Sequence, residues 1–196
     1  MNNLYNMNMN MNQMNNFNFN YQNYNQKEQI KLTRLRKEFQ LCAQDDDLMQ
    51  IGCSFGLYEN NISTWRVTMI GPKKTPYEGC IFTIKILFPD DYPSHGPEFK
   101  FMNKIFHWNV DYNNDLGHIS LNYLNEWHVK GKVTGKRVYG VKQALFDIFC
   151  LFYNQGVYDA YDDKMAELYV KNREKFDKIA KEWTEKYAKK NPEYYL

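Results

Sequence analysis

Apolar residues recur at helical spacing directly after the first 26 residues. Leu32, Leu35, Phe39 and Cys42 stand at i, i+3, i+7 and i+10, so they share one side of a helix. This pattern predicts a first helix that buries a single face.

A two-residue alternation follows in the middle of the chain. The alternating apolar residues are Trp65, Val67 and Met69 in one segment, and Phe82, Ile84, Ile86 and Phe88 in the next. Such alternation predicts two strands that each turn one face inward. Gly71-Pro72 and the residues up to Gly79 supply a turn between them, and a short third strand is expected around Glu98 to Phe101. These strands would form an antiparallel meander.

Helical spacing returns in the C-terminal third. The apolar positions are Val141, Leu145, Ile148, Phe149 and Phe152 in one segment, and Phe176, Ile179, Ala180, Trp183 and Tyr187 in the last. Helices that flank one small antiparallel sheet make an α+β domain.

Composition changes this picture little. The chain has 196 residues, 43% hydrophobic and 17% aromatic, which suits one domain with a sizeable core. Its formal net charge of +2 does not call for a polyanionic partner. We therefore expect a single core domain over residues 27–196.

Cysteine usage and hydropathy bear on the compartment. The four cysteines form no C-x-x-C pair, so neither a disulfide framework nor a zinc site is indicated, and no cofactor is expected. No apolar run approaches the ~18 residues that a membrane span requires, and the first residues lack the marks of a secretory signal or a transit peptide. The expectation is an intracellular protein, cytoplasmic by default, with an organelle or a cytoskeletal assembly left open.

Residues 1–26 are an Asn/Met-rich low-complexity tail. They contain twelve Asn and no charge, and such a segment should be disordered in isolation. Its Met and aromatic side chains, with Phe17, Phe19 and Tyr21 as candidate contacts, would suit the apolar groove of a partner protein. The alternative is a tail without a role.

Ordered motifs over residues 27 to about 190 resemble those of the ubiquitin-conjugating enzymes. In chain order they are Trp65, Gly71-Pro72, Thr75-Pro76-Tyr77-Glu78-Gly79, Phe88-Pro89, Tyr92-Pro93, Lys104-Ile105-Phe106-His107, Asn109, Arg173-Glu174-Lys175-Phe176, Trp183-Thr184 and Lys186-Tyr187-Ala188. The resemblance implies that family's α+β fold, a four-stranded antiparallel meander flanked by about four helices.

Ser120 occupies the position where the family carries its nucleophilic cysteine. A thiol with a pKa of about 8.5 is partly ionised at neutral pH, whereas a serine needs a base beside it. His107 and His118 are nearby in the sequence, but no acid partner or oxyanion-hole motif is legible. The resemblance therefore predicts a degenerate catalytic site and a protein that is not an enzyme.

Other departures accompany Ser120. The family's His-Pro-Asn is His107-Trp108-Asn109, and the acidic residue that commonly follows the nucleophile is Asn122. Asn109, which in the family would help to stabilise the oxyanion, can equally satisfy the backbone of a buried loop. In the loop near residue 154, only Asp159 aligns with an acidic residue of the family's site.

The surfaces that the family uses to recognise ligases also differ. Ser94 follows Tyr92-Pro93 where the family has a hydrophobic residue, and residues 128–136 replace a Ser-Pro-Ala-like loop. From Val129 to Lys142 the basic residues are Lys130, Lys132, Lys136, Arg137 and Lys142, with no acidic one. This stretch is either a solvated loop or a contact to an acidic protein face. Nucleic acid is disfavoured, because Tyr139 is the one aromatic residue there.

Three function classes remain open. The first is a non-catalytic scaffold subunit of a large protein complex. The second is a regulatory variant that binds ubiquitin or an active conjugating enzyme. The third is an enzyme that uses Ser120 to form an ester. We rank them in that order.

Overall fold

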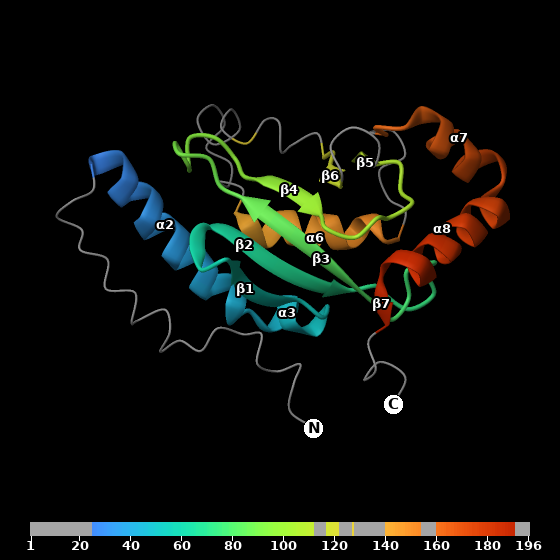
Figure 1. Cartoon of the computed structure of the whole chain (residues 1–196), viewed down its shortest axis with the longest axis horizontal. Helices are drawn as coiled ribbons and strands as arrows, with labels where there is room; N and C mark the ends of the chain where they lie inside the picture. Colours follow the sequence, from blue (N-terminus) through green and yellow to red (C-terminus); the bar gives the residue numbers. More distant parts are fainter. Residues whose placement is uncertain (1–24, 112–116, 122–126, 128–139, 154–159, 191–196) are drawn as a thin grey trace, which may run out of the picture.

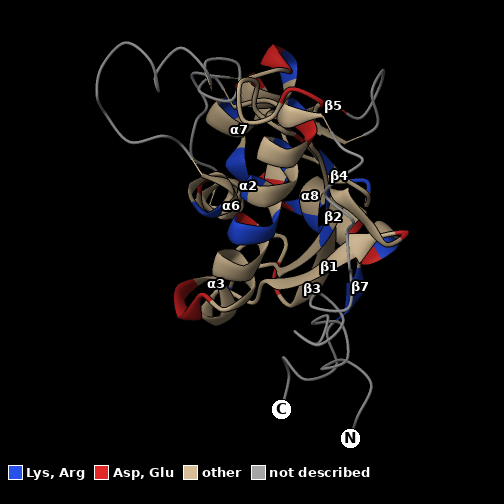
Figure 2. Cartoon of the chain, turned by 90° about the vertical axis from the view of Figure 1, so that its left-hand side faces the viewer, with Lys and Arg blue, Asp and Glu red and all other residues tan. Residues whose placement is uncertain are grey.

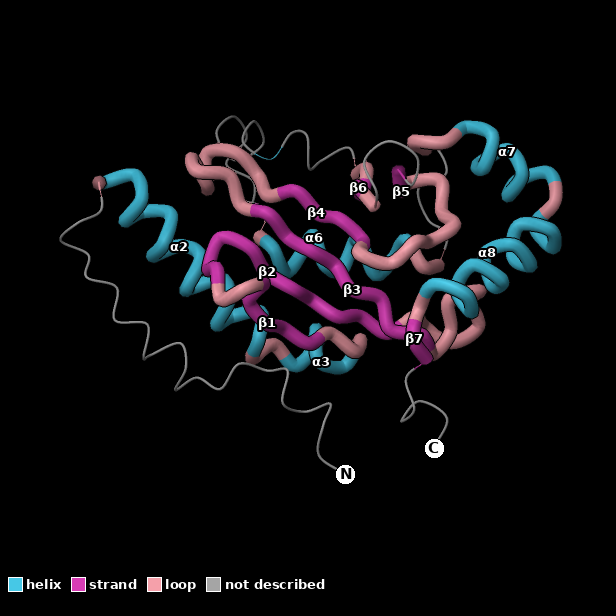
Figure 3. Tube along the Cα trace, viewed as in Figure 1, coloured by secondary structure: helices cyan, strands magenta, loops and turns pink. Residues whose placement is uncertain are grey.

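The computed structural model describes residues 25–111, 117–121, 127, 140–153 and 160–190. In this part of the chain, seven antiparallel strands form one sheet in the order β1-β2-β3-β4-β6-β5, and β7 pairs with β3. Helices α2 and α6 lie behind the sheet, and α7 and α8 lie beyond one end of it (Figures 1 and 3). The expected α+β fold is confirmed.

Four strands make the predicted meander. They are β1 (Ser54–Tyr58), β2 (Asn61–Ile70), β3 (Cys80–Leu87) and β4 (Glu98–Phe101). Three two-residue strands extend the sheet: β5 (Val110–Asp111), β6 (His118–Ile119) and β7 (Lys189–Lys190). The hydrophobic pattern of the sequence gives no residue bounds for β1, β5, β6 or β7.

The alternation in β2 and β3 sets the two faces of the sheet. Trp65, Val67 and Met69 are fully buried, and the residues between them are half-buried. Trp65 lies directly opposite Ile86, and Val67 lies opposite Ile84, so the core rows of the two strands coincide. The predicted inward faces are therefore confirmed, and the core lies on one side of the sheet.

Five helices lie in the described residues. They are α2 (Gln26–Ala43), α3 (Asp46–Gln50), α6 (Val141–Leu151), α7 (Asp163–Lys171) and α8 (Arg173–Tyr187). Helix α2 begins with a capping box in which Asn25 and Glu28 satisfy each other's backbone N–H groups, and its predicted stripe is buried. Helices α3 and α7 were not anticipated. None of the helices in the described ranges is long and apolar enough to cross a membrane.

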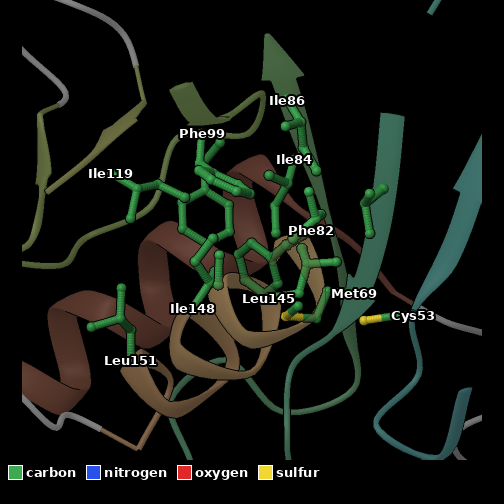
Figure 4. Packing of buried hydrophobic residues seen from close by; sticks show 14 of the residues in the cluster. Cys53, Met69, Phe82, Ile84, Ile86, Phe99, Ile119, Leu145, Ile148 and Leu151 are labelled. Atoms are coloured by element: carbon green, nitrogen blue, oxygen red, sulfur yellow. The ribbon is translucent and has the colours of Figure 1, made fainter. Parts of the chain in front are cut away.

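Helices α2 and α6 cover the core face. The rings of Phe39 on α2 and Trp65 are 5.0 Å apart, edge to face. Figure 4 shows Leu145 and Ile148 of α6 packed beside Phe82 and Phe99 of the sheet. Burial of such large side chains supplies most of the driving force for this arrangement.

Glu38 on α2 fixes where α6 begins. Gly140, the N-cap residue of α6, offers no side-chain acceptor. Instead Glu38 Oε2 accepts a hydrogen bond from the Val141 N–H at 3.2 Å, and Glu38 Oε1 accepts one from the Tyr92 hydroxyl at 2.7 Å. A buried carboxylate from another helix therefore does the work of an N-cap.

Candidate functional site

Ser120 lies directly after β6 and is held against the loop that contains Asn109. The Ser120 N–H donates to the Asn109 carbonyl oxygen at 2.8 Å, and Asn109 Nδ2 donates to the Ser120 carbonyl oxygen at 3.2 Å. Asn109 is fully buried. Its amide therefore supports the backbone of this loop, which is one of the two roles that the sequence left open.

His107 is buried beneath the same loop, and both of its ring nitrogens are engaged by backbone groups. Nδ1 accepts a hydrogen bond from the Asn109 N–H at 3.0 Å, and Nε2 is 3.0 Å from the Leu151 carbonyl oxygen. Because a carbonyl can only accept and a backbone N–H can only donate, the ring must carry its proton on Nε2.

The environment of His107 also disfavours a charged ring. Burial lowers the pKa of His107 to about 4, although the hydrogen bond to Leu151 opposes the shift. The imidazole is therefore neutral at physiological pH, with its lone pair already used. Protonation of Nδ1 would cost the hydrogen bond from the Asn109 N–H.

Trp108 anchors the loop from the other side. It is fully buried, and its ring stacks on His107 with the centroids 4.5 Å apart. Its ring centroid also lies 4.5 Å from that of Tyr169 on α7 and 5.2 Å from that of Phe176 on α8. In the sequence, Trp108 stands out only because the family has a proline there, whereas in the structure it links this loop to the C-terminal helices.

Backbone and side-chain hydrogen bonds add to this link. The Trp108 carbonyl oxygen accepts from the N–H groups of Tyr161 at 2.8 Å and Asp162 at 3.0 Å. The Tyr161 hydroxyl donates to Asp111 Oδ2 at 2.8 Å. The stretch from His107 to Asp111 is thus held at several points.

Gly117 brings the chain back toward Ser120. Its φ of +86° is in the left-handed region, and a Cβ at this position would lie 1.9 Å from the Phe101 carbonyl oxygen. Only glycine fits here without moving the backbone.

Ser120 itself is half-buried. Within the described ranges, no side chain forms a hydrogen bond with its hydroxyl, and none joins it to His118. His118 lies on β6, directly opposite Lys100 and Asp111. The structure thus links Ser120 and His107 through Asn109, and both ring nitrogens of His107 are engaged by backbone groups rather than by Ser120.

Burial disfavours the thiolate form of all four cysteines. Burial raises the pKa of Cys42 and of Cys53 to about 12, and also raises the pKa values of Cys80 and Cys150. All four are free cysteines away from the loop of Ser120: Cys42, Cys80 and Cys150 lie on α2, β3 and α6, and Cys53 lies just before β1. No group of metal-ligating side chains occurs in the described part of the chain.

Several predicted residues lie outside the described residues. These are Asn122, Asp159, Lys130, Lys132, Lys136, Arg137, Phe17, Phe19 and Tyr21. Lys142, the last residue of the basic stretch, is described, and its ammonium group pairs with Asp45 and Asp47 of the same chain. This lysine contacts an acidic surface, but one that belongs to its own fold.

Comparison with known proteins agrees with the fold. The family model described as ubiquitin-conjugating enzyme matches residues 34–184. The chain is 34% identical over 136 residues to ubiquitin-conjugating enzyme E2 13 of Saccharomyces cerevisiae, covering 69% of this chain and 82% of that protein.

A solved structure shows the same similarity to ubiquitin-conjugating enzymes. The E2 domain of a ubiquitin conjugating enzyme from Toxoplasma gondii superposes with a TM-score of 0.64 at 33% identity, over 81% of this chain and 99% of that one. On these matches, the chain belongs to the ubiquitin-conjugating enzyme family.

Proposed function

We propose that this chain is a non-catalytic member of the family that acts as a structural or scaffold subunit of a larger protein assembly. One observation carries the proposal. Ser120 stands where the resemblance places the nucleophilic cysteine, and the nearby His107 has both ring nitrogens committed to the backbone.

The physical argument concerns activation of the hydroxyl. A serine attacks a thioester only when a base removes its proton during the attack. His107 is neutral but its lone pair faces the Asn109 N–H, so protonation would cost that hydrogen bond as well as placing a buried charge. The ester-forming alternative therefore receives no support from the described residues.

Two further features favour a retained fold with a changed use. The Trp108 contacts with α7 and α8 stabilise the loop without requiring a nucleophile in it. Ser94 is exposed and polar where the family presents a hydrophobic residue to ligases. Loss of both the nucleophile and the ligase contact favours the scaffold role over a regulator that still works in ubiquitin transfer.

The test is adduct formation by the purified full chain. Wild type and Ser120→Ala are incubated with activating enzyme, ubiquitin and ATP, and each product is analysed by intact mass before and after treatment with hydroxylamine. We expect neither protein to gain the mass of ubiquitin. A hydroxylamine-sensitive adduct on wild type, absent from Ser120→Ala, would instead establish an ester-forming enzyme.

A second arm separates the scaffold role from the regulatory role. Binding of free ubiquitin and of an active conjugating enzyme is measured by titration. The scaffold role predicts no saturable binding of either one. Stoichiometric binding of either protein would favour the regulatory alternative.

A further inference from the structure

Helix α6 is apolar on two of its sides. Its buried residues face the core and are Val141, Ala144, Leu145, Ile148 and Leu151. A second set of apolar residues, Phe146, Phe149 and Cys150, is only half-buried. A helix that serves only its own core normally carries polar residues on the outer side. Apolar side chains there indicate an interaction surface.

The outer side of α6 and the turn after it carry a regular set of residues. Lys142, Phe146, Phe149 and Tyr153 have the spacing of alternating a and d positions in a coiled coil. The rings of Phe149 and Tyr153 meet edge to face with their centroids 5.8 Å apart, and Lys142 Nζ lies 5.7 Å from the centre of the Phe146 ring. We call these four residues the outer stripe. Figure 2 shows α6 beside α2 on the helical side of the sheet.

Both ends of the outer stripe are accessible. Tyr153 is 49% exposed, and the Lys142 side chain is 45% exposed. The Lys142 ammonium group donates to Asp45 and Asp47, so its position is fixed before any partner arrives. Binding to a preordered side chain costs less conformational entropy. The stripe therefore presents an aromatic centre, a fixed cation at one end and a phenol ring at the other.

The spacing of the outer stripe is the same when it is read from either end. If two copies of α6 lie antiparallel about a two-fold axis that passes between positions 147 and 148, Phe146 of one copy faces Phe149 of the other. Lys142 then faces Tyr153 of the other copy. Each contact occurs twice, as in any isologous interface.

We propose that α6 forms the two-fold interface of a homodimer of this chain, in which the two outer stripes pack antiparallel. The central Phe contacts bury apolar area, and the two end contacts are cation–π interactions. A parallel pair would instead place Lys142 beside Lys142, and such like-charge contacts are unfavourable.

A second copy fits this surface better than an unrelated partner does, because the stripe is complementary to itself. Its aromatic centre would suit many apolar surfaces. Its ends are more specific, since they require an aromatic ring opposite Lys142 and a cation opposite Tyr153. A second outer stripe supplies both at the correct separation.

The contact is small, because a helix of this length spans only about 16 Å. Such an interface buries less than the ~800 Å² per partner of a standard complex, so we expect a dissociation constant of about 10–100 µM. The homodimer would give the proposed scaffold role a second copy of this chain as a partner, but it does not depend on loss of catalysis. Self-association and adduct formation are separate measurements, so failure of one leaves the other standing.

Sedimentation velocity of the purified full chain at about 5 to 500 µM tests the proposal, since this range brackets the expected dissociation constant. We expect a concentration-dependent equilibrium between monomer and dimer. Tyr153→Ala should weaken it by about tenfold, because two symmetry-related cation–π contacts are lost together. Val170→Ala changes an exposed apolar residue of α7 and is the matched control, with an expected change of less than about twofold.

A mixing experiment tests the antiparallel register. Phe146→Lys and Phe149→Glu each place a charge against an aromatic ring in their own dimers, so each variant alone should be monomeric. In an equimolar mixture, position 146 of one variant faces position 149 of the other. One contact then joins opposite charges, and the second joins the two remaining Phe side chains, so association should return. A parallel dimer would not be restored by mixing.

Three results would overturn the proposal. The first is a monomeric wild type over the whole concentration range. The second is a dimer that Tyr153→Ala leaves unchanged, and this arm holds even if the variants at positions 146 and 149 fail to fold, because Tyr153 is half-exposed. The third is a mixture that stays monomeric although both variants melt like wild type. Saturable ubiquitin binding that Tyr153→Ala abolishes, without self-association, would assign the stripe to ubiquitin instead.

Discussion

His107 Nε2 donates to the carbonyl oxygen of Leu151, a residue 44 positions further along the chain. This contact joins the loop before Ser120 to the end of α6. Because the His107 ring is neutral in the folded protein, its burial also makes the stability of the protein depend on pH.

The sign of that dependence follows from the two pKa values. The pKa of His107 is about 4 in the folded protein, against 6.5 for an ordinary histidine. As the pH falls from 6.5 toward 4, His107 is protonated in the unfolded chain but not in the folded chain. The contribution of His107 to stability is therefore fully present above pH 6.5 and is lost progressively as the pH falls toward 4. The full loss is about 3 kcal/mol.

Urea unfolding between pH 7.5 and 4 measures this loss. His107→Gln should remove it, and the exposed His95, changed to Gln, is the matched control that should leave it in place. The assignment of a neutral, buried His107 would be contradicted by equal pH profiles for wild type and His107→Gln.

Trp108 should contribute more to stability than its place in a loop suggests. Trp108→Ala would leave a cavity between His107, Tyr169 and Phe176, and we expect a loss of about 3–5 kcal/mol. Trp108→Phe should cost less because it keeps an aromatic ring. Hydrogen exchange should show the loosened amides in α7 and α8. If Trp108→Ala costs under about 1 kcal/mol, the residue is not the anchor described above.

Gly117→Ala should destabilise the return of the chain to Ser120. The substitution combines a φ of +86° with a Cβ 1.9 Å from the Phe101 carbonyl oxygen, and we expect a loss of about 2 kcal/mol or more. At Gly140, where a Cβ would meet no atom within 4 Å, alanine should change stability by less than about 0.5 kcal/mol. Thermal unfolding of both variants gives the comparison. Similar melting temperatures for the two would show that position 117 does not require glycine.

Glu38→Gln tests the remote cap of α6. The carboxylate accepts from the Val141 N–H and the Tyr92 hydroxyl and pairs with Arg34. An amide can replace only one of these acceptors well, so we expect a loss of about 2 kcal/mol in urea unfolding. Thr33→Ala, on the exposed side of α2, is the control for a change in the same helix. A Glu38→Gln protein as stable as wild type would show that α6 starts without this cap.

Much of the fold could be predicted from local patterns. The alternation around Trp65 and Phe82 needs no distant partner to be recognised, and neither does the stripe on α2. Strand β1 could not be predicted because it contains Gly56 and buries only Phe55, so its sequence shows no clear alternation. Helix α7 could not be predicted because it is short and buries only Met165 and Ala166.

The sequence predicts that Ser120, His107 and Asn109 belong to one site, and that remains a prediction. The contacts that these residues make could not be predicted. The state of His107 depends on a carbonyl group of α6, and the packing of Trp108 depends on α7 and α8. Likewise, Arg66, Lys85 and Lys100 become neighbours only through strand register. Such long-range contacts leave no local signal in a sequence.

The central claim is that this member of the family has departed from ubiquitin transfer in its loop and surfaces as well as at Ser120, and Ser120→Cys tests it most directly. The variant places a thiol at position 120 and changes nothing else. It is incubated with activating enzyme, ubiquitin, ATP and an ordinary ligase, and transfer to lysine is followed on a gel under reducing conditions. The account predicts no transfer, because the loop around His107 and the exposed Ser94 are unchanged. Transfer by Ser120→Cys would contradict it and would show an enzyme silenced at a single position.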